Sequence, residues 1–218
     1  MKLTHDYLPG TQIYLHQRKD MFRMNTDTAL LGRFMKVKED ETVMDIGTNN
    51  GALLLYASQF THGKLIGVEV QKEAAELAEM NLRENAVENY AIIHSDIKDV
   101  TYPVDVIVCN PPYFVVTQPK QLNENEYKRI ARHECYLTLD TLCESVARNL
   151  KEKGRFYLVH RADRIVDILT KLREHDLEVK TIQMIRDENN DVAHGILIEA
   201  VKEGKTHCTV LEEIVVTR

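Results

Sequence analysis

The sequence lacks the features that mark disulfide-stabilised, metal-binding or membrane-spanning chains. It has 4 cysteines in 218 residues, and no two of them have the C-x-x-C spacing of a zinc or redox site. Its 9 histidines show no metal-ligand spacing either. The longest apolar runs, at 52–55 and 195–198, are far shorter than the roughly 20 residues that a membrane-spanning helix needs. We therefore expect reduced thiols, no bound metal and no membrane span.

Signs of export, low complexity and internal repetition are missing as well. The first residues carry no apolar core of the kind found in a signal peptide, and the chain has no repeat, biased segment or long linker. Hydrophobic residues make up 44% of the chain, which is enough for a sizeable core and excludes disorder throughout. We expect a cytoplasmic protein built around one large domain, and nothing indicates a stable protein partner.

The chain is acidic overall, but two of its segments carry a net positive charge. The net charge of −6 argues against a protein that coats nucleic acid non-specifically. Residues 1–38 nevertheless carry seven basic and three acidic side chains, and residues 148–164 carry six basic and two acidic ones, so each segment has a net charge of +4. Each segment alone reads as an ordinary solvated face. If both lie beside one active-site loop, they would form a phosphate-binding surface.

From residue 41 onward, short β-branched runs alternate with amphipathic helices, the pattern of a parallel sheet with crossover connections. A short polar turn at 187–191 joins the last two strands, so we expect these to be antiparallel neighbours. The predicted fold is α/β, a mostly parallel seven-stranded sheet with one antiparallel strand and helices on both faces. The expected strands are 43–46, 65–69, 91–94, 104–109, 155–159, 179–185 and 195–201. The expected helices are one capped by Thr26-Asp27 with an apolar stripe through 29–35, then 51–60, 71–85, 124–132, 140–150 and one through 165–172.

The predicted strand 104–109 ends abruptly in Asn110-Pro111-Pro112-Tyr113. Two consecutive prolines donate no backbone N–H and have φ fixed at about −65°, so the chain leaves the sheet with its carbonyls held in one direction. An amide side chain and an aromatic ring stand beside these rigid carbonyls. The stretch is predicted to be an active-site loop at the carboxyl end of a strand.

The ends of the first two strands carry residues suited to a nucleoside-containing cofactor. The first strand runs through Asp45 into a loop containing Gly47 and Gly51, where the absence of side chains allows close backbone approach. The second strand ends at Glu69, whose carboxylate is placed to accept hydrogen bonds from both ribose hydroxyls. We therefore predict that these four residues bind the cofactor.

Two further strand ends extend this edge. Asp96 follows the third strand, where its carboxylate is expected to accept a hydrogen bond from an exocyclic adenine amine while Ile97 packs on the ring. Asn110 follows the fourth strand and is expected to contact the cofactor as well as the substrate. Four successive strand ends along one edge of the sheet then carry candidate residues, which makes coincidence a poor explanation.

This set of residues resembles the class I S-adenosylmethionine-dependent methyltransferases, and N-P-P-Y at 110–113 matches the signature of enzymes that methylate exocyclic or amide nitrogens. Within that class the chain is most similar to the bacterial valine-tRNA adenosine N6-methyltransferases. Members usually read G-T-G-N-G in the first loop, and Asn49 departs from this pattern, although Asn tolerates a positive φ better than most residues. The similar stretches are Phe22 with Thr26 to Leu31, Asp45 to Thr48, Gly67 to Gln71, Asn110 to Phe114, Ala131 to Glu134 and Val159 to Arg161.

The resemblance implies a Rossmann-like methyltransferase fold, S-adenosylmethionine as cofactor and tRNA as partner. It implies methylation of the exocyclic N6 amine of an adenosine, the one next to the anticodon of valine tRNA. It divides the chain into an N-terminal segment, 1–38, that covers cofactor and substrate, and a single methyltransferase domain, 39–218. By analogy with the family, Phe22 and Asp27 close over the methionine end of the cofactor.

The chemistry of the loop leads to the same reaction. An adenine amine is a poor nucleophile because its lone pair is delocalised into the ring. The Asn110 side-chain oxygen and the Pro111 carbonyl would accept its two N–H bonds and stabilise the positive charge that develops on the nitrogen. Pro112 keeps the loop rigid, and Tyr113, together with Phe114, would stack on the extruded base. The predicted catalytic residues are Asn110, Pro111, Pro112 and Tyr113.

Candidate RNA contacts lie further along the chain. We assign 132–134 to shaping the pocket or contacting RNA, because the proposed reaction needs no acid or base from His133 or Glu134. His160 and Arg161 follow a strand inside the second basic segment, where they suit a phosphate. The predicted substrate-binding residues are Tyr113, Phe114, Arg132, His160 and Arg161.

Other functions stay open from the sequence. Protein glutamine N5-methylation uses the same loop on an amide, but those enzymes carry a sizeable N-terminal recognition domain and only about forty residues precede the first strand here. DNA adenine methylation fits less well, because no segment is long enough for a target-recognition domain. Asn49 also leaves open a degenerate protein that binds S-adenosylmethionine or RNA without catalysis.

Overall fold

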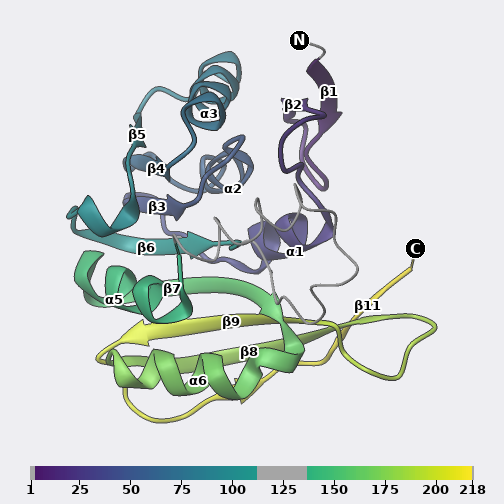
Figure 1. Ribbon diagram of the computed structural model, residues 1–218, viewed down its shortest axis with the longest axis vertical. Coiled ribbons are helices and arrows are strands. Elements are labelled where there is room, and N and C mark those ends of the chain that lie inside the picture. The colour runs from purple at the N-terminus through teal and green to yellow at the C-terminus, as the bar shows by residue number, and fades with distance from the viewer. Residues whose placement is uncertain (1–2, 112–136, 218) are drawn as a thin grey trace, which may run out of the picture.

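The computed structural model describes residues 3–111 and 137–217. Within them a central sheet carries helices on both faces, and a separate two-stranded hairpin lies near the amino terminus (Figure 1). The strands are β1 (Leu3–Tyr7), β2 (Tyr14–Arg18), β3 (Val43–Ile46), β4 (Leu65–Glu69), β5 (Tyr90–His94), β6 (Val104–Cys109), β7 (Leu150–Arg161), β8 (Leu177–Asp187), β9 (Gly195–Lys202), β10 (Thr209–Val210) and β11 (Ile214–Val216). The helices are α1 (Thr26–Phe34), α2 (Ala52–Ala57), α3 (Lys72–Glu84), α5 (Leu139–Asn149) and α6 (Ile165–Glu174), with short 3-10 turns η1 (Ile97–Asp99) and η3 (Ala162–Arg164).

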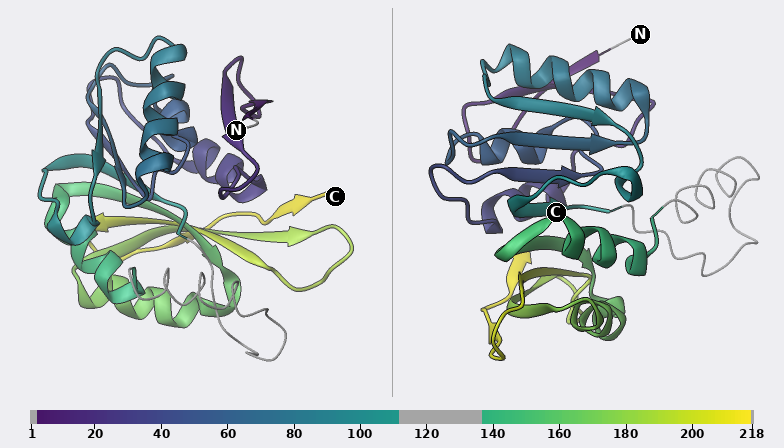
Figure 2. Two further views of the ribbon diagram at one scale, coloured as in Figure 1. Left: turned by 45° about the horizontal axis from the view of Figure 1, so that its top comes forward. Right: turned by 90° about the vertical axis from the view of Figure 1, so that its left-hand side faces the viewer.

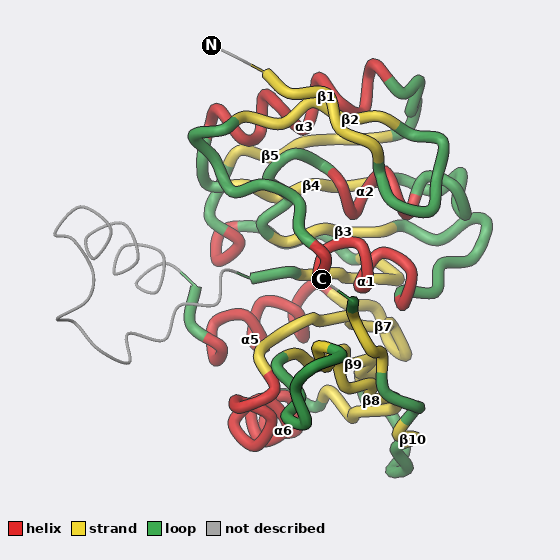
Figure 3. Tube along the Cα trace, turned by 90° about the vertical axis from the view of Figure 1, so that its right-hand side faces the viewer, coloured by secondary structure: helices red, strands yellow, loops and turns green. Residues whose placement is uncertain are grey.

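The strand order of the sheet is β10-β8-β9-β7-β6-β3-β4-β5, with β11 also paired to β8. Figure 3 shows these strands one above another, from β5 down to β8. β3 pairs in parallel with β4 and β6, whereas β9 is antiparallel to both β7 and β8. This confirms the mostly parallel sheet with one antiparallel strand. The short β10 and β11, which pair in parallel with β8, were not predicted.

Side-chain alternation along the central strands divides the apolar residues between two cores. Met44 and Ile107 face the layer that contains α5 and α6, and Val43 and Val106 face the layer that contains α1 and α2. β3 and β4 are buried along their whole length, as expected for parallel strands covered on both faces. In both views of Figure 2 the hairpin and α3 lie toward one end of the strand order and α6 toward the other.

The β1–β2 hairpin is the largest feature of the described residues that the sequence analysis missed. Its segment reads as polar and basic, but Leu15 and Gln17 of β2 are buried while Tyr14 is exposed. Gln17 is only 2% exposed, and its buried amide is hydrogen-bonded: Nε2 donates to Asp6 Oδ2 at 2.8 Å and Oε1 accepts from the Met24 N–H at 2.7 Å. A buried glutamine breaks the apolar alternation that normally signals a strand, so the pattern was hidden.

The N-cap of helix α1 lies one residue before the predicted cap. The N-cap is Asn25, whose side-chain oxygen accepts from the Thr28 N–H, rather than Thr26-Asp27. Leu31 is fully buried in the same core as α2, and a Cβ added to Gly32 would lie 2.2 Å from the Tyr56 ring. This close contact fixes α1 against α2. The division of the chain at residue 38 stays a prediction.

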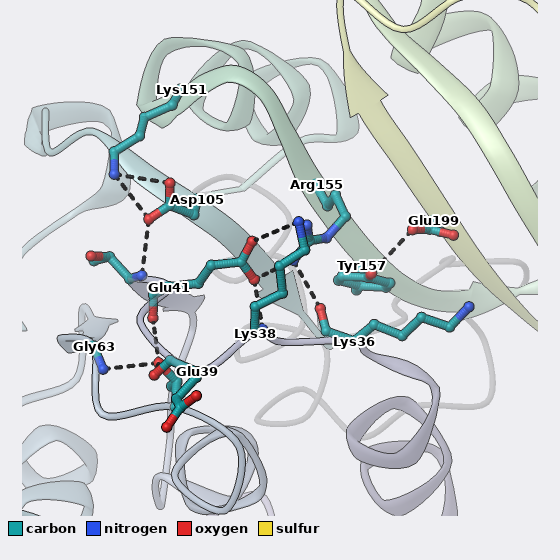
Figure 4. A network of polar contacts seen from close by, with 12 residues as sticks. Lys36, Lys38, Glu39, Glu41, Gly63, Asp105, Lys151, Arg155, Tyr157 and Glu199 are labelled. Atoms are coloured by element: carbon teal, nitrogen blue, oxygen red, sulfur yellow. Dashed lines mark hydrogen bonds and ion pairs between the residues drawn. The ribbon is translucent and has the colours of Figure 1, made fainter.

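A charged network ties together the amino ends of β3, β6 and β7 (Figure 4). Arg155 forms an ion pair with Glu41 and donates to the Lys36 carbonyl at 3.1 Å. Asp105 accepts from the Thr42 N–H at 3.0 Å and from Lys151 Nζ at 2.9 Å. The network holds the chain entering β3 against the two neighbouring strands.

The same network separates the second basic segment into two groups. Lys151 and Arg155 lie in the first half of β7, paired with acidic side chains, whereas His160 and Arg161 lie at its end. A strand of this length carries its two ends to opposite edges of the sheet. The hypothesis that residues 148–164 form one phosphate-binding rim therefore fails for Lys151 and Arg155.

We predict that Glu41→Ala lowers the free energy of unfolding by about 2 to 3 kcal/mol, because it leaves the guanidinium of Arg155 largely buried without its partner charge. Both side chains are only 16% exposed. Lys151→Ala, which removes a more exposed partner, should cost less than about 1 kcal/mol. Urea denaturation of the two variants measures the difference, and equal losses would contradict the burial argument.

Candidate active site

Strand register brings the predicted residues to one edge of the sheet. Ile46 of β3 pairs with Val68 of β4 and with Cys109 of β6. The residues that follow these three, Gly47, Glu69 and Asn110, are therefore neighbours at the carboxyl edge. Parallel α/β sheets bind their ligands at this edge.

The loop after β3 turns through three residues in the left-handed region. Gly47 has φ 74°, Asn49 has φ 48° and Gly51, the N-cap of α2, has φ 80°. A Cβ added to Gly47 would meet no atom within 4 Å, so this glycine borders open space. A Cβ on Gly51 would lie 3.4 Å from Ala78, an ordinary van der Waals distance, so the positive φ rather than a lack of space favours glycine at this position. Asn49 holds the positive φ that the family usually leaves to glycine.

Glu69 contributes a carboxylate that hydrogen-bonds to this loop. Its Oε2 accepts from the Asn49 N–H at 2.9 Å, and its Oε1 accepts from the Gln71 N–H at 2.9 Å. The side chain is 6% exposed. Each carboxylate oxygen has a further lone pair, so both can still accept from the hydroxyls of a ribose. Its role in binding the cofactor stays a prediction.

Asp45 is a buried carboxyl with only one of its oxygens engaged among the described residues. Oδ2 accepts from the Thr48 hydroxyl at 2.8 Å, and Oδ1 is buried with no hydrogen-bond partner there. Burial raises the pKa of Asp45 from 3.8 to about 7, the Thr48 hydroxyl opposes this, and the charge of Glu69 adds to it. The group can therefore carry a proton at neutral pH.

The positions of the two residues expected to bind the cofactor after β5 agree with the prediction for Asp96 but not for Ile97. Asp96 lies two residues beyond the end of β5 and caps η1, with Oδ1 accepting from the Lys98 N–H at 3.0 Å. Ile97 is 5% exposed and packs in the core with Val100 and Val146, so little of it is left to pack on an adenine ring. Asp96 remains a candidate for binding the cofactor, and Ile97 belongs to the hydrophobic core.

Asn110 is oriented by the cap of helix α1. Its Nδ2 donates to the Thr28 hydroxyl at 2.9 Å, and that hydroxyl donates to Asn25 Oδ1 at 3.0 Å. Because the Thr28 proton is committed to Asn25, the hydroxyl can only accept from Asn110, which fixes the orientation of the amide. The Oδ1 of Asn110 is left buried with no partner among the described residues. Sequence reasoning missed Thr28 and Asn25, because nothing in the local pattern links them to a residue 82 positions away.

His160 and Arg161 end β7 at the same edge, but both are already engaged. His160 Nδ1 accepts from the Arg161 N–H at 2.8 Å, and burial, assisted by the charge of Arg164, lowers the pKa of His160 to about 4. Arg161 forms an ion pair with Asp163. His160 is therefore neutral at pH 7 and would meet a phosphate as a hydrogen-bonding group rather than as a cation.

Several predicted residues lie outside the described part of the chain. They are Pro112, Tyr113, Phe114 and Arg132, together with His133, Glu134 and the expected helix at 124–132. In residues 3–111 and 137–217 no group of three or more His, Cys, Asp or Glu side chains is arranged to hold a metal ion. Within the same residues no helix is long and apolar enough to cross a membrane.

The fold and this edge define a methyltransferase. A family model described as a methyltransferase domain matches residues 37–213, and the chain belongs to that family. Two crystal structures share the fold: a predicted O-methyltransferase from Agrobacterium tumefaciens (TM-score 0.67, 15% identity, 87% of each chain) and an S-adenosylmethionine-dependent O-methyltransferase from Thermotoga maritima (TM-score 0.60, 20% identity, 87% of this chain and 69% of the other).

Curated relatives identify the branch of the family. Proteins named tRNA1(Val) (adenine(37)-N6)-methyltransferase are 30% identical in Pedobacter heparinus, over 82% of this chain and 77% of the relative, and 27% identical in Cytophaga hutchinsonii, over 89% of this chain and 83% of the relative. The chain belongs to the tRNA1(Val) (adenine(37)-N6)-methyltransferase family, as its motifs predicted.

The methyl donor of this family is S-adenosylmethionine, and the residues present fit it. The backbone at Gly47 borders open space, the Glu69 oxygens have lone pairs to spare, and Asp45 Oδ1 is unpartnered among the described residues. These are acceptors for hydroxyl and amino groups. The protein would hold the donor between the loop after β3 and the ends of β4 to β6.

Asp45→Asn should stabilise the cofactor-free protein at pH 8 and change it little at pH 4. The pKa of Asp45 is raised on folding, so the native protein loses stability as pH rises from about 4 through about 7, and Asn removes that loss. Thermal denaturation across this range tests the sign.

Asp105→Asn is the matched control. Burial acts to raise the pKa of Asp105, but hydrogen bonds from Lys151 and the Thr42 N–H lower it overall. This variant should therefore be less stable than the native protein at pH 8, with a smaller deficit at low pH. The same pH dependence for both variants would contradict the assignment.

Proposed function

We propose that the protein transfers a methyl group from S-adenosylmethionine to the exocyclic N6 amine of adenosine 37 in valine tRNA. The observation that carries the proposal is the Asn110 carboxamide at the end of β6, whose amide nitrogen donates to Thr28 while its oxygen has no hydrogen-bond partner in residues 3–111 and 137–217. Support for the substrate comes from relatives that carry this activity in their names. A cytoplasmic location, where such a tRNA would be met, is part of the proposal.

The chemistry asks the protein to bind an amine, orient it and stabilise charge. When bound, S-adenosylmethionine supplies an electrophilic methyl group on a sulfonium. Asn110 Oδ1 and the Pro111 carbonyl accept the two N–H bonds of the adenine amine, which aims its nitrogen and stabilises the positive charge that grows on it. The proton is released after transfer, when the amine has become acidic, so no side chain has to act as a base beforehand.

Thr28 serves this chemistry by holding Asn110 in one orientation. A carboxamide that rotated by half a turn would present N–H groups to an amine that also donates, and the pair would repel. The acceptor is therefore preorganised, and no reorganisation free energy is needed during the reaction. Thr28 itself is 6% exposed and lies behind Asn110 as a positioning residue.

The substrate side of the site is proposed on the motif and the resemblance. Pro112 would keep the loop rigid, Tyr113 and Phe114 would stack on the base, and Arg132 would contact RNA. His160 and Arg161 would meet the phosphates near the end of β7, Arg161 after exchanging Asp163 for a phosphate oxygen. Protein glutamine methylation and a non-catalytic binding role are not favoured, because the curated relatives carry the tRNA-modifying name.

The direct test is methylation of valine tRNA that lacks the modification, with labelled S-adenosylmethionine and nucleoside analysis. We expect one N6-methyladenosine per tRNA, and none when adenosine 37 is replaced by guanosine. Absence of N6-methyladenosine at saturating cofactor, while a glutamine-containing protein is labelled, would overturn the proposal.

Asn110→Ala should leave the affinity for S-adenosylmethionine nearly intact and lower kcat by about a hundredfold or more, as expected when a stabiliser of developing charge is removed. Thr28→Val should lower kcat by about five- to tenfold, the worth of one orienting hydrogen bond. Calorimetric titration and initial rates measure the two quantities. An equal loss of affinity and turnover in Asn110→Ala would mean that this residue mainly builds the fold.

A further inference from the structure

Amide side chains join the N-terminal segment to the cofactor loop and to α3. Gln17 Oε1 accepts from Asn50 Nδ2 at 3.2 Å and from the Met24 N–H at 2.7 Å. Asn81 of α3 binds both the N–H and the carbonyl of His16, at 2.7 Å and 3.0 Å, and also donates to the Asn50 carbonyl at 2.8 Å. We call Gln17, Asn49, Asn50 and Asn81 the amide seam.

Asn49 is the member of this seam that also contacts Glu69, a predicted cofactor-binding residue. Its backbone N–H donates to Glu69 Oε2, and its side-chain Nδ2 donates to the Phe22 carbonyl at 2.6 Å. One residue therefore connects the carboxylate expected to bind ribose with the segment between β2 and α1. A glycine at this position keeps the first contact and loses the second.

Besides the Asn49 contact, ion pairs hold the outer part of this segment, Asp20 with Arg18 and Arg23 with Asp6. Ion pairs at the surface contribute little, and Phe22 is 53% exposed. The hydrogen bond from Asn49 to the Phe22 carbonyl brings this segment against the loop that follows β3. An exposed apolar ring next to a ligand edge gains burial when a ligand arrives, provided that the backbone beneath it is already in position.

We propose that Asn49 is a positioning residue that latches residues 19–24 over the cofactor loop, so that S-adenosylmethionine binding in this chain depends on the N-terminal hairpin. Asn49 occupies the left-handed conformation at some cost relative to glycine. The hydrogen bond to the Phe22 carbonyl offsets that cost by holding residues 19–24 over the loop before the ligand binds. The inference rests on S-adenosylmethionine being the ligand of this edge.

The left-handed backbone of residue 49 is easier for glycine to adopt, whereas the hydrogen bond to Phe22 requires the asparagine side chain. Replacing Asn49 should therefore affect stability and cofactor affinity differently. Asn49→Gly relieves the backbone and removes the latch. We expect unchanged or higher thermal stability without ligand, about five- to tenfold weaker binding of S-adenosylmethionine by calorimetry, and kcat at saturating cofactor within about twofold of native. Asn49→Gly binding as tightly as native would overturn the latch, and so would a loss of thermal stability matched by the loss of binding.

Limited trypsin digestion tests the latch independently of enzymatic activity. Cleavage after Arg18, Lys19 and Arg23 should be faster in Asn49→Gly than in native protein, and S-adenosylmethionine should protect native protein more strongly than the variant. Identical cleavage of both proteins would overturn the proposal. Asn49→Asp is the second variant, because it keeps a side chain suited to the left-handed region and replaces the donor with an acceptor, and it should cleave as fast as Asn49→Gly.

Asn85→Ala is the matched control. Asn85 Nδ2 also donates to a hairpin carbonyl, that of Tyr14 at 2.8 Å, but from the end of α3 and away from the cofactor loop. The control should leave S-adenosylmethionine affinity unchanged, and a loss equal to that of Asn49→Gly would overturn the assignment to Asn49. If native protein fails to bind S-adenosylmethionine, the proposed function falls and the latch with it; if only the difference between native and Asn49→Gly is absent, the latch alone falls.

Discussion

The parallel pairing of β3 with β4 on one side and β6 on the other is the constraint on which the site depends. It sets Gly47, Glu69 and Asn110 beside one another, although 63 residues separate Gly47 from Asn110 along the chain. The pairing is stable because both faces of these strands are covered, by α1 and α2 on one side and α5 and α6 on the other. A shift of register by one residue would turn Asp45 from one core into the other and separate the strand ends.

On this scaffold, polar side chains from the N-terminal segment complete the site. The cap of α1 orients Asn110 through Thr28, and the amide seam holds the β2–α1 segment against the loop after β3. Buried amides are costly unless satisfied, so each of these contacts also selects one arrangement of the segment over others. The same residues that hold the fold at this edge therefore prepare the acceptor for the amine.

The strand ends were predictable from sequence because each rests on a local pattern: an apolar run followed by a glycine, an acid or an Asn-Pro pair. The alternation of strands and helices and the polar turn before β9 predicted the sheet for the same reason. The contact of Thr28 with Asn110 and the burial of Gln17 arise from tertiary packing, so no local signal marks them. The prediction that the second basic segment forms one phosphate-binding surface was wrong for Lys151 and Arg155. A charge count along the sequence does not show that the two ends of β7 lie far apart, or that these two side chains are paired with acids.

Asn110 Oδ1, at the edge made by β3, β4 and β6, is the atom that we propose accepts a hydrogen bond from the adenine amine. A crystal structure with S-adenosylhomocysteine and an anticodon stem-loop of valine tRNA tests this proposal most directly. We expect N6 of adenosine 37 to lie within hydrogen-bonding distance of Asn110 Oδ1 and the Pro111 carbonyl, with the Asn110 amide nitrogen still bound to Thr28. An adenine bound at another edge, or an Asn110 carboxamide turned away from it, would contradict the account.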